Sequence, residues 1–325
     1  MKGRNVKRVK KATLALVQTA AILLVYLSAV AQAQTALSAD QLLKRGIKHY
    51  QNQNLDAAIA DFTRAIEVNS GASRMPVMSF SFAGGNSNGD GFDTVAVADP
   101  FNALAYYNRG IAWFSKGELD QAIADFDKAI RINPVYTDAY VRRGRSLQSK
   151  GETDLAIADY DKAIRLDPRS AFAYNNRGIA QRVKSDIAGA ISDFDKAISI
   201  NPRLAEVYVN RGAARCVAGE ISGAIADLDK AISINPLNAM AFNNRGKAHQ
   251  LRSDLRAAIA DYSQAIKLVP DYSLAYANRG LALLSAGKPD QAESDFKRAR
   301  QLNPDLKPSL DQLIDEVKSS RAAKP

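Results

Sequence analysis

Arginine and aspartate recur together at one fixed spacing along most of the 325-residue chain. Each arginine of the set is followed sixteen residues later by an aspartate. The arginines are Arg45, Arg109, Arg143, Arg177, Arg211, Arg245 and Arg279, and the aspartates are Asp61, Asp125, Asp159, Asp193, Asp227, Asp261 and Asp295. Opposite charges at a constant offset indicate an ion pair that is repeated along the chain. We therefore expect a structural ladder of ion pairs here and not an active site.

A row of asparagines stands directly before these arginines, with Lys44 and Arg142 at the two departures from it. A side-chain amide can donate to a backbone carbonyl and accept from a backbone N–H, so an evenly spaced row can hold an extended peptide whatever its sequence. Arg142 would favour a carboxylate instead. The candidate peptide-binding residues are Asn108, Arg142, Asn176, Asn210, Asn244 and Asn278. The alternative is that asparagine is simply a common polar choice on an exposed helical face.

Residues that usually catalyse reactions are scarce and dispersed. The chain has two histidines, His49 and His249, which occupy the same place in distant copies of the repeating pattern, where Trp113 stands in another copy. The sole cysteine, Cys216, has no neighbouring base in the sequence and no partner for an intramolecular disulfide. Phosphate-binding glycine motifs and paired-cysteine zinc spacings do not occur. We expect no enzymatic activity, no metal site and no cofactor.

A 34-residue period positions all of these residues. When the glycine after each arginine is numbered eight, positions 20 and 27 are alanine in every copy, position 24 is large, and position 32 is proline in six copies. Glycine and alanine leave room for two antiparallel helices to approach closely, and large side chains fill the remaining space. Proline ends the second helix. The period predicts pairs of helices that stack on their neighbours.

This pattern resembles the tetratricopeptide repeat (TPR). The resemblance implies an all-α, right-handed solenoid of seven helix-turn-helix repeats, followed by a capping helix and tail at 307–325. The repeats are expected at 39–72, 103–136, 137–170, 171–204, 205–238, 239–272 and 273–306. In this family the first helix of each repeat lines the concave face, and the asparagine row resembles the ladder of peptide-binding TPR superhelices.

Residues 73–102 form an insertion and linker that interrupts the period. Met75–Phe82 alternates in part between apolar and polar residues, and Thr94–Val97 has the composition of a return strand, so a hairpin or a long loop is expected. A second hypothesis is that Met78, Phe80 and Phe82 contact a partner. Asn86, Asn88, Asp90 and Asp93 superficially resemble a calcium loop, but the place of the bidentate glutamate is taken by Val97.

The N-terminus has the form of a targeting signal. Six basic residues lie in the first eleven positions, an uncharged apolar stretch follows, and Ala31-Gln32-Ala33 supplies a cleavage site. Residues 1–33 are therefore expected to be a signal peptide, or alternatively an uncleaved N-terminal anchor. The formal net charge is +10, and the part after this segment carries only four of those charges, so charge does not imply a nucleic-acid partner.

We expect a non-enzymatic scaffold for protein–protein interaction in the cell envelope, which holds an extended segment of a protein or peptide partner. The alternative is a chaperone-like assembly factor for exported proteins. The expected location is the periplasm, with an inner-membrane-anchored or secreted protein as alternatives, and no membrane contact is expected beyond the N-terminal segment. Mixed apolar and amide positions suit a peptide better than a polyanion, which would require a stripe of Lys and Arg.

Overall fold

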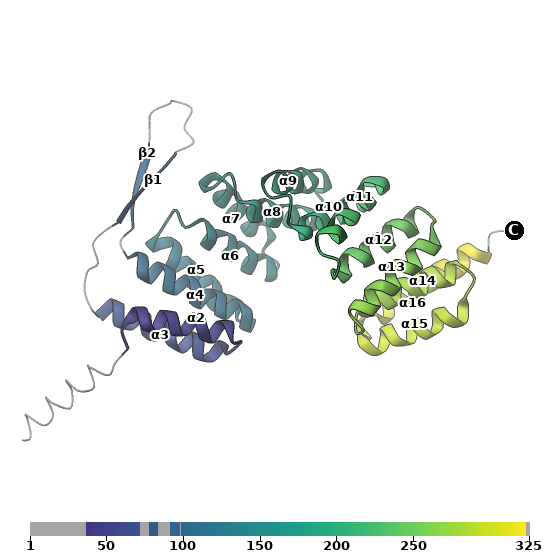
Figure 1. The fold of residues 1–325 in the computed structure, drawn as a ribbon, viewed down its shortest axis with the longest axis horizontal. Helices are drawn as coiled ribbons and strands as arrows, with labels where there is room; N and C mark the ends of the chain where they lie inside the picture. Colours follow the sequence, from purple (N-terminus) through teal and green to yellow (C-terminus); the bar gives the residue numbers. More distant parts are fainter. Residues whose placement is uncertain (1–36, 72–77, 84–91, 98, 323–325) are drawn as a thin grey trace, which may run out of the picture. The chain divides into compact units, whose positions relative to one another are not determined.

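The computed structural model describes residues 37–71, 78–83, 92–97 and 99–322. Most of these residues are helical (Figure 1). The predicted signal segment 1–33 lies outside the described residues, as do Asn86, Asn88 and Asp90 of the calcium-like sequence. Within the described residues, no helix is both long and apolar enough to cross a membrane.

The described helices form successive pairs, and the two helices of each pair pack against one another. The first helices are α2 (Ala39–Gln51), α4 (Pro100–Lys116), α6 (Thr137–Ser149), α8 (Ala171–Val183), α10 (Ala205–Ala218), α12 (Ala239–Leu251) and α14 (Ser273–Ser285). The second helices are α3 (Leu55–Gly71), α5 (Leu119–Ile132), α7 (Thr153–Leu166), α9 (Ile187–Ile200), α11 (Ile221–Ile234), α13 (Leu255–Leu268) and α15 (Pro289–Leu302). The predicted all-α repeat fold is therefore confirmed.

The helices belong to two compact units, one with α2–α5 and one with α6–α16. In both units, the second helix of a pair packs on the first helix of the next pair, for example α3 on α4 and α9 on α10. First helices of neighbouring pairs also touch, so in the larger unit α6, α8, α10, α12 and α14 form a continuous layer. Residues at the same repeat position on these helices consequently lie side by side.

The two helices of each pair meet at the glycine of position eight. A methyl group added at Gly144 would lie 2.6 Å from Cε1 of Tyr160, which is fully buried at position 24 of the same repeat. The large residue at position 24 therefore packs on the glycine of its own repeat. The alanines at positions 20 and 27, such as Ala156 and Ala163, are also fully buried. Small residues at these places allow the close approach that the sequence predicted.

The turn between the helices of each pair has a left-handed residue at position 15. It is glycine in four repeats, with φ of +79° to +87° at Gly117, Gly151, Gly219 and Gly287. Gln53, Ser185 and Ser253 take the same conformation, with φ of 61°, 65° and 65°. Only glycine adopts this region without steric cost, so these three turns are locally strained.

Residues 73–102 contain two strands, β1 (Met78–Ala83) and β2 (Phe92–Val97), paired in one sheet. Because the connection between them is too short for a parallel crossover, they form a hairpin, as one of the expectations had it. Helix α4 begins at Pro100, inside the predicted linker, since the Asp99 side chain accepts a hydrogen bond from the backbone N–H of Asn102.

The chain ends in the expected capping helix, α16 (Lys307–Ala322), which follows a short 3-10 helix, η1 (Pro304–Leu306), and packs on α14. Leu310 and Ile314 are buried against the last repeat. Leu313 of the same helix is 44% exposed.

Candidate functional site

The ladder of ion pairs predicted from the sequence is present in every repeat. In each, the arginine Nε and Nη2 donate to the two carboxylate oxygens of the aspartate sixteen residues later; in the fourth repeat both Arg177–Asp193 distances are 2.7 Å. The seven aspartates are buried. These hydrogen bonds hold the pKa of Arg177 above its ordinary value. The pairs join α8 to α9 and their equivalents, so they are structural, as expected.

The same guanidinium groups also connect neighbouring repeats. Arg177, Arg211 and Arg245 each donate through Nη1 to an aspartate on the second helix of the preceding repeat, at Asp161, Asp195 and Asp229. Each guanidinium also lies over the aromatic ring three residues before it, as Arg177 does at 5.6 Å from the centroid of Tyr174. Arg177, Arg211 and Arg245 are therefore each occupied by carboxylates of two repeats and are not available to a partner.

The asparagine before each arginine lies about 100° away around the helix, because an α-helix turns by that angle per residue. Asn176, Asn210, Asn244 and Asn278 thus lie on the face of α8, α10, α12 and α14 that the ladder of ion pairs does not use. These four asparagines lie on successive, contacting first helices of the larger unit, with Arg142 on the adjacent α6. Asn108 belongs to the smaller unit, and its Nδ2 donates to the backbone carbonyl of Leu104 at 2.8 Å.

Along the row, asparagines whose side chain is hydrogen-bonded alternate with asparagines whose side chain is not. Asn210 Nδ2 donates to Asn175 Oδ1 at 2.9 Å, and Asn278 Nδ2 donates to Asn243 Oδ1 at 3.0 Å. Within the described part of the chain, the side chains of Asn176 and Asn244 have no hydrogen-bond partner. Asn176 and Asn244 therefore have the donor and acceptor groups that a bound peptide could use.

Position five of the preceding repeat determines this alternation. It is a buried asparagine in α8 and α12, at Asn175 and Asn243, and a buried valine in α6 and α10, at Val141 and Val209. Asparagine offers a carbonyl oxygen to the next amide in the row, and valine does not. The row of asparagines at position six is uniform in sequence from Asn176 to Asn278 but not in its hydrogen bonds, a difference that was not predicted from the sequence. The signal was present, since the residue at position five differs between alternate repeats.

Exposed apolar side chains accompany the row at position two. Phe172, Met240 and Leu274 are 56%, 54% and 47% exposed. Each lies four residues before an asparagine of the row, so the two side chains are neighbours on one helical face. In α6, which precedes these helices, and in α10, which lies between α8 and α12, position two is acidic, at Asp138 and Glu206. Repeats four and six thus combine an exposed apolar side chain with an unpaired amide.

The remaining reactive residues form no site among the described residues. His49 and His249 each place Nε2 3.7 Å from the aspartate of their own repeat, Asp61 and Asp261. Burial raises the pKa of the Cys216 thiol, and Lys247 lowers it by less. No group of three or more His, Cys, Asp or Glu side chains with the geometry for a metal ion occurs in the described ranges.

Comparison with protein families identifies the repeat. A sequence model described as "Tetratricopeptide repeat" matches residues 103–136 and 273–306, and one described as "TPR repeat" matches residues 144–182 and 251–287. Curated protein sequences gave no match.

Solved structures of low sequence identity share the fold. A tetratricopeptide repeat protein from Parabacteroides merdae ATCC 43184 is similar with a TM-score of 0.63 and 18% identity, over 85% of this chain and 98% of that one. Pseudomonas aeruginosa pilF is similar with a TM-score of 0.58 and 19% identity, over 67% of this chain and 97% of that one.

A third similar structure is the APC/C hetero-tetramer Cut9-Hcn1, with a TM-score of 0.61 and 19% identity over 66% of this chain. The match covers 42% of that chain, so the present chain spans less than half of its length. The helix pairs, the 34-residue period and the family matches agree. Residues 103–136, 144–182 and 251–306 therefore match tetratricopeptide repeats, which generally mediate protein–protein interactions and are generally non-catalytic.

Proposed function

We propose that this protein is a non-enzymatic scaffold of the cell envelope, and that it binds an extended segment of a partner protein along the layer of first helices α8, α10, α12 and α14. The observation that carries this proposal is the pair of unpaired amides at Asn176 and Asn244, each with an exposed apolar neighbour. A peptide backbone needs both a donor and an acceptor, and an asparagine side chain supplies both.

The same pair of groups occurs twice along the layer of first helices. Phe172 with Asn176 and Met240 with Asn244 are equivalent sets on α8 and α12, separated by one repeat. Side chains of the bound segment would contact the apolar residues, while its backbone would bond to the amides. The paired amides of Asn210 and Asn278 already have a partner, so they contribute less. Arg142, on the neighbouring α6, would receive an acidic side chain of the same segment.

The location in the envelope is proposed from the sequence of residues 1–33. Basic residues, an apolar stretch and small residues at a cleavage site are the three parts of an export signal. The proposed location is the periplasm. Expression of the full chain with a C-terminal tag, followed by cell fractionation and mass determination of the N-terminus, tests it. A tagged protein in the cytosol that retains residues 1–33 would contradict the export proposal.

Affinity capture from envelope extract tests the binding proposal. The wild-type chain is compared with the double variant Asn176→Ala/Asn244→Ala, and bound proteins are identified by mass spectrometry. The scaffold proposal predicts that one or two proteins are captured and that the variant loses them. The matched control is Asn108→Ala, since Asn108 bonds to its own helix in the smaller unit. Equal capture by the wild type and the double variant would contradict the proposal.

The same surface also suits the alternative function, a chaperone-like assembly factor. Large apolar side chains exposed at Phe172, Met240 and Leu274 are the groups that contact unfolded chains. A chaperone-like factor would capture many exported proteins weakly, whereas a scaffold captures one or two. The number of captured proteins therefore distinguishes the two functions in the same experiment.

A further inference from the structure

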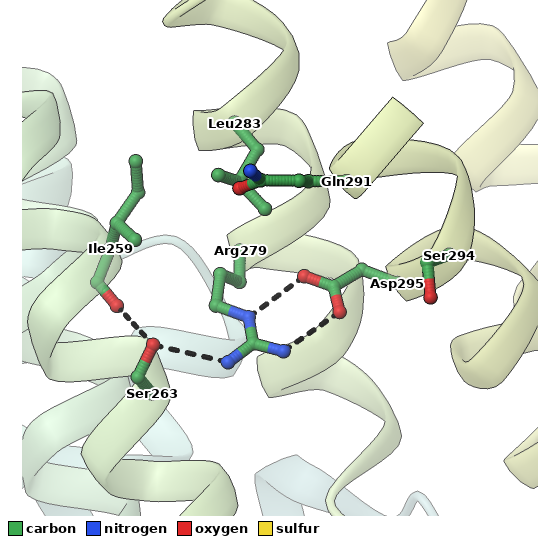
Figure 2. A pocket seen from close by; sticks show the side chains of 7 residues that line it. All are labelled: Ile259, Ser263, Arg279, Leu283, Gln291, Ser294 and Asp295. Carbon is green, nitrogen blue, oxygen red and sulfur yellow. Dashed lines mark hydrogen bonds and ion pairs between the residues drawn. The ribbon is translucent and has the colours of Figure 1, made fainter. Parts of the chain in front are cut away.

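A cavity of about 340 Å³ lies between α13, α14 and α15, beside the guanidinium group of Arg279. Figure 2 shows Arg279 at its centre, with Asp295 on one side and Ser263 on the other. Nε and Nη2 of Arg279 bind the two carboxylate oxygens of Asp295, each at 2.8 Å. Nη1 donates to the hydroxyl of Ser263 at 3.1 Å. Ile259, Leu283, Gln291 and Ser294 also line the cavity.

The junction between the last two repeats differs from the three junctions before it. Arg177, Arg211 and Arg245 each lie between two carboxylates, one from their own repeat and one from the repeat before. At Arg279 the residue in the place of the second carboxylate is Ser263. Serine has a shorter side chain and no charge. This junction therefore lacks one negative charge that the preceding three possess, and a cavity lies beside the uncharged replacement.

We propose that this cavity binds a carboxylate, namely the side chain of an aspartate or glutamate that a partner protein presents. One incoming carboxylate gives Arg279 the same set of charges that Asp229 and Asp261 give Arg245. Charge-assisted hydrogen bonds to a guanidinium group are among the strong ones. The amide of Gln291 is a further donor in the lining, and Ile259 and Leu283 contact the methylene groups of the acidic side chain.

This site is separate from the peptide-binding surface proposed above. Arg279 follows Asn278 directly, so their side chains leave α14 about 100° apart. Ile259 and Ser263 belong to the second helix of the sixth repeat, α13, and not to the layer of first helices. The carboxylate site therefore uses neither Asn176 nor Asn244. The double variant Asn176→Ala/Asn244→Ala is expected to leave carboxylate binding unchanged.

The experiment is an NMR titration of the full chain labelled with 13C at the methyl groups of isoleucine and leucine. The probe is N-acetyl-aspartate methylamide, and the matched control ligand is N-acetyl-asparagine methylamide, which has the same shape without the charge. The proposal predicts saturable shifts of the Ile259 and Leu283 methyl signals with the aspartate probe only. This comparison needs no variant. Equal shifts with both ligands, or no saturable shift, would overturn the proposal.

Ser263→Asp supplies the second test, because it restores the carboxylate that the preceding junctions have. Its expected effect is to weaken binding of the aspartate probe by at least about tenfold. Ser263→Ala is the matched control. It removes the hydroxyl, adds no negative charge beside Arg279 and leaves the cavity open, so the aspartate probe should still bind. Circular dichroism verifies that both variants are folded. Unchanged binding in a folded Ser263→Asp variant would show that the probe binds elsewhere.

Discussion

The side-chain amide of Asn210 donates a hydrogen bond to the side-chain oxygen of Asn175, 35 residues earlier on the first helix of the preceding repeat. One repeat further along, Val209 takes the place of the acceptor, and Asn244 has no such bond within the described residues. The asparagines at position six are thus of two kinds, paired and unpaired, and the residue at position five of the preceding repeat decides which. From α8 to α14 the hydrogen-bond state of these amides therefore repeats every two repeats, whereas the helix pairs recur in every repeat.

Exchange of the residue at position five should change the state of the next amide. Asn175→Val frees Asn210, and since valine already fills this place at Val141 and Val209, the stability should change by no more than about 1 kcal/mol. The affinity for the captured partner should rise, because a third amide becomes available. The reverse change, Val209→Asn, should engage Asn244 and weaken binding. Isothermal titration with the partner measures both, and equal affinities in the two variants would refute the role of position five.

Loss of one carboxylate from the ladder of ion pairs should destabilise the fold strongly. Asp193→Asn leaves the guanidinium of Arg177 without its buried bidentate partner, which should cost about 3 kcal/mol. Asp195→Asn is the control, because Asp195 also pairs with an arginine but its side chain is 51% exposed. That change should cost less than about 1 kcal/mol. Urea denaturation followed by circular dichroism measures the free energy of unfolding of both variants. Equal losses of stability would contradict the claim that the buried ion pair stabilises the fold more than the exposed one.

A glycine in a strained turn should stabilise the protein. Ser185 has φ of 65° at the position where four other repeats have glycine. Ser185→Gly removes the strain of the left-handed conformation, which should stabilise the folded state by about 1 kcal/mol. The greater conformational entropy of glycine in the unfolded chain offsets part of this gain. The reciprocal change, Gly219→Ser, should lower it. Thermal melting curves measure both shifts, which must have opposite signs for the explanation to stand.

The cysteine thiol should react slowly. Burial raises the pKa of Cys216, so at pH 8 a smaller fraction is thiolate, the reactive form, than in an exposed cysteine. Alkylation by iodoacetamide should therefore be slower in the folded protein than in urea, and its rate should keep rising at pH values above the usual cysteine range. Since the chain has a single cysteine, mass spectrometry reports this rate directly. Equal rates in the two states would contradict the effect of burial.

The fold could be predicted because its determinants repeat. The contact of Gly144 with the ring of Tyr160 explains why one position is glycine and the other is large. The same two positions recur in every repeat, so the helix pairs could be predicted from the sequence alone. The start of α4 at Pro100 could not be predicted, because it depends on the local cap that Asp99 provides outside the period. The candidate site was found only in outline. Which amides are unpaired depends on contacts between neighbouring repeats, and the exposure of Leu313 depends on how α16 packs on α14.

The central claim is that the layer of first helices binds a partner segment. Photo-crosslinking tests it most directly, with p-benzoylphenylalanine placed singly at Phe172, Met240 or Leu155 and the full chain incubated with envelope extract. All three side chains are at least half exposed, but Leu155 lies on the second helix α7. We predict that positions 172 and 240 crosslink to the same partner, that position 155 does not, and that Asn176→Ala/Asn244→Ala abolishes the products. Crosslinking confined to position 155, or products that persist in the double variant, would contradict the proposed binding surface.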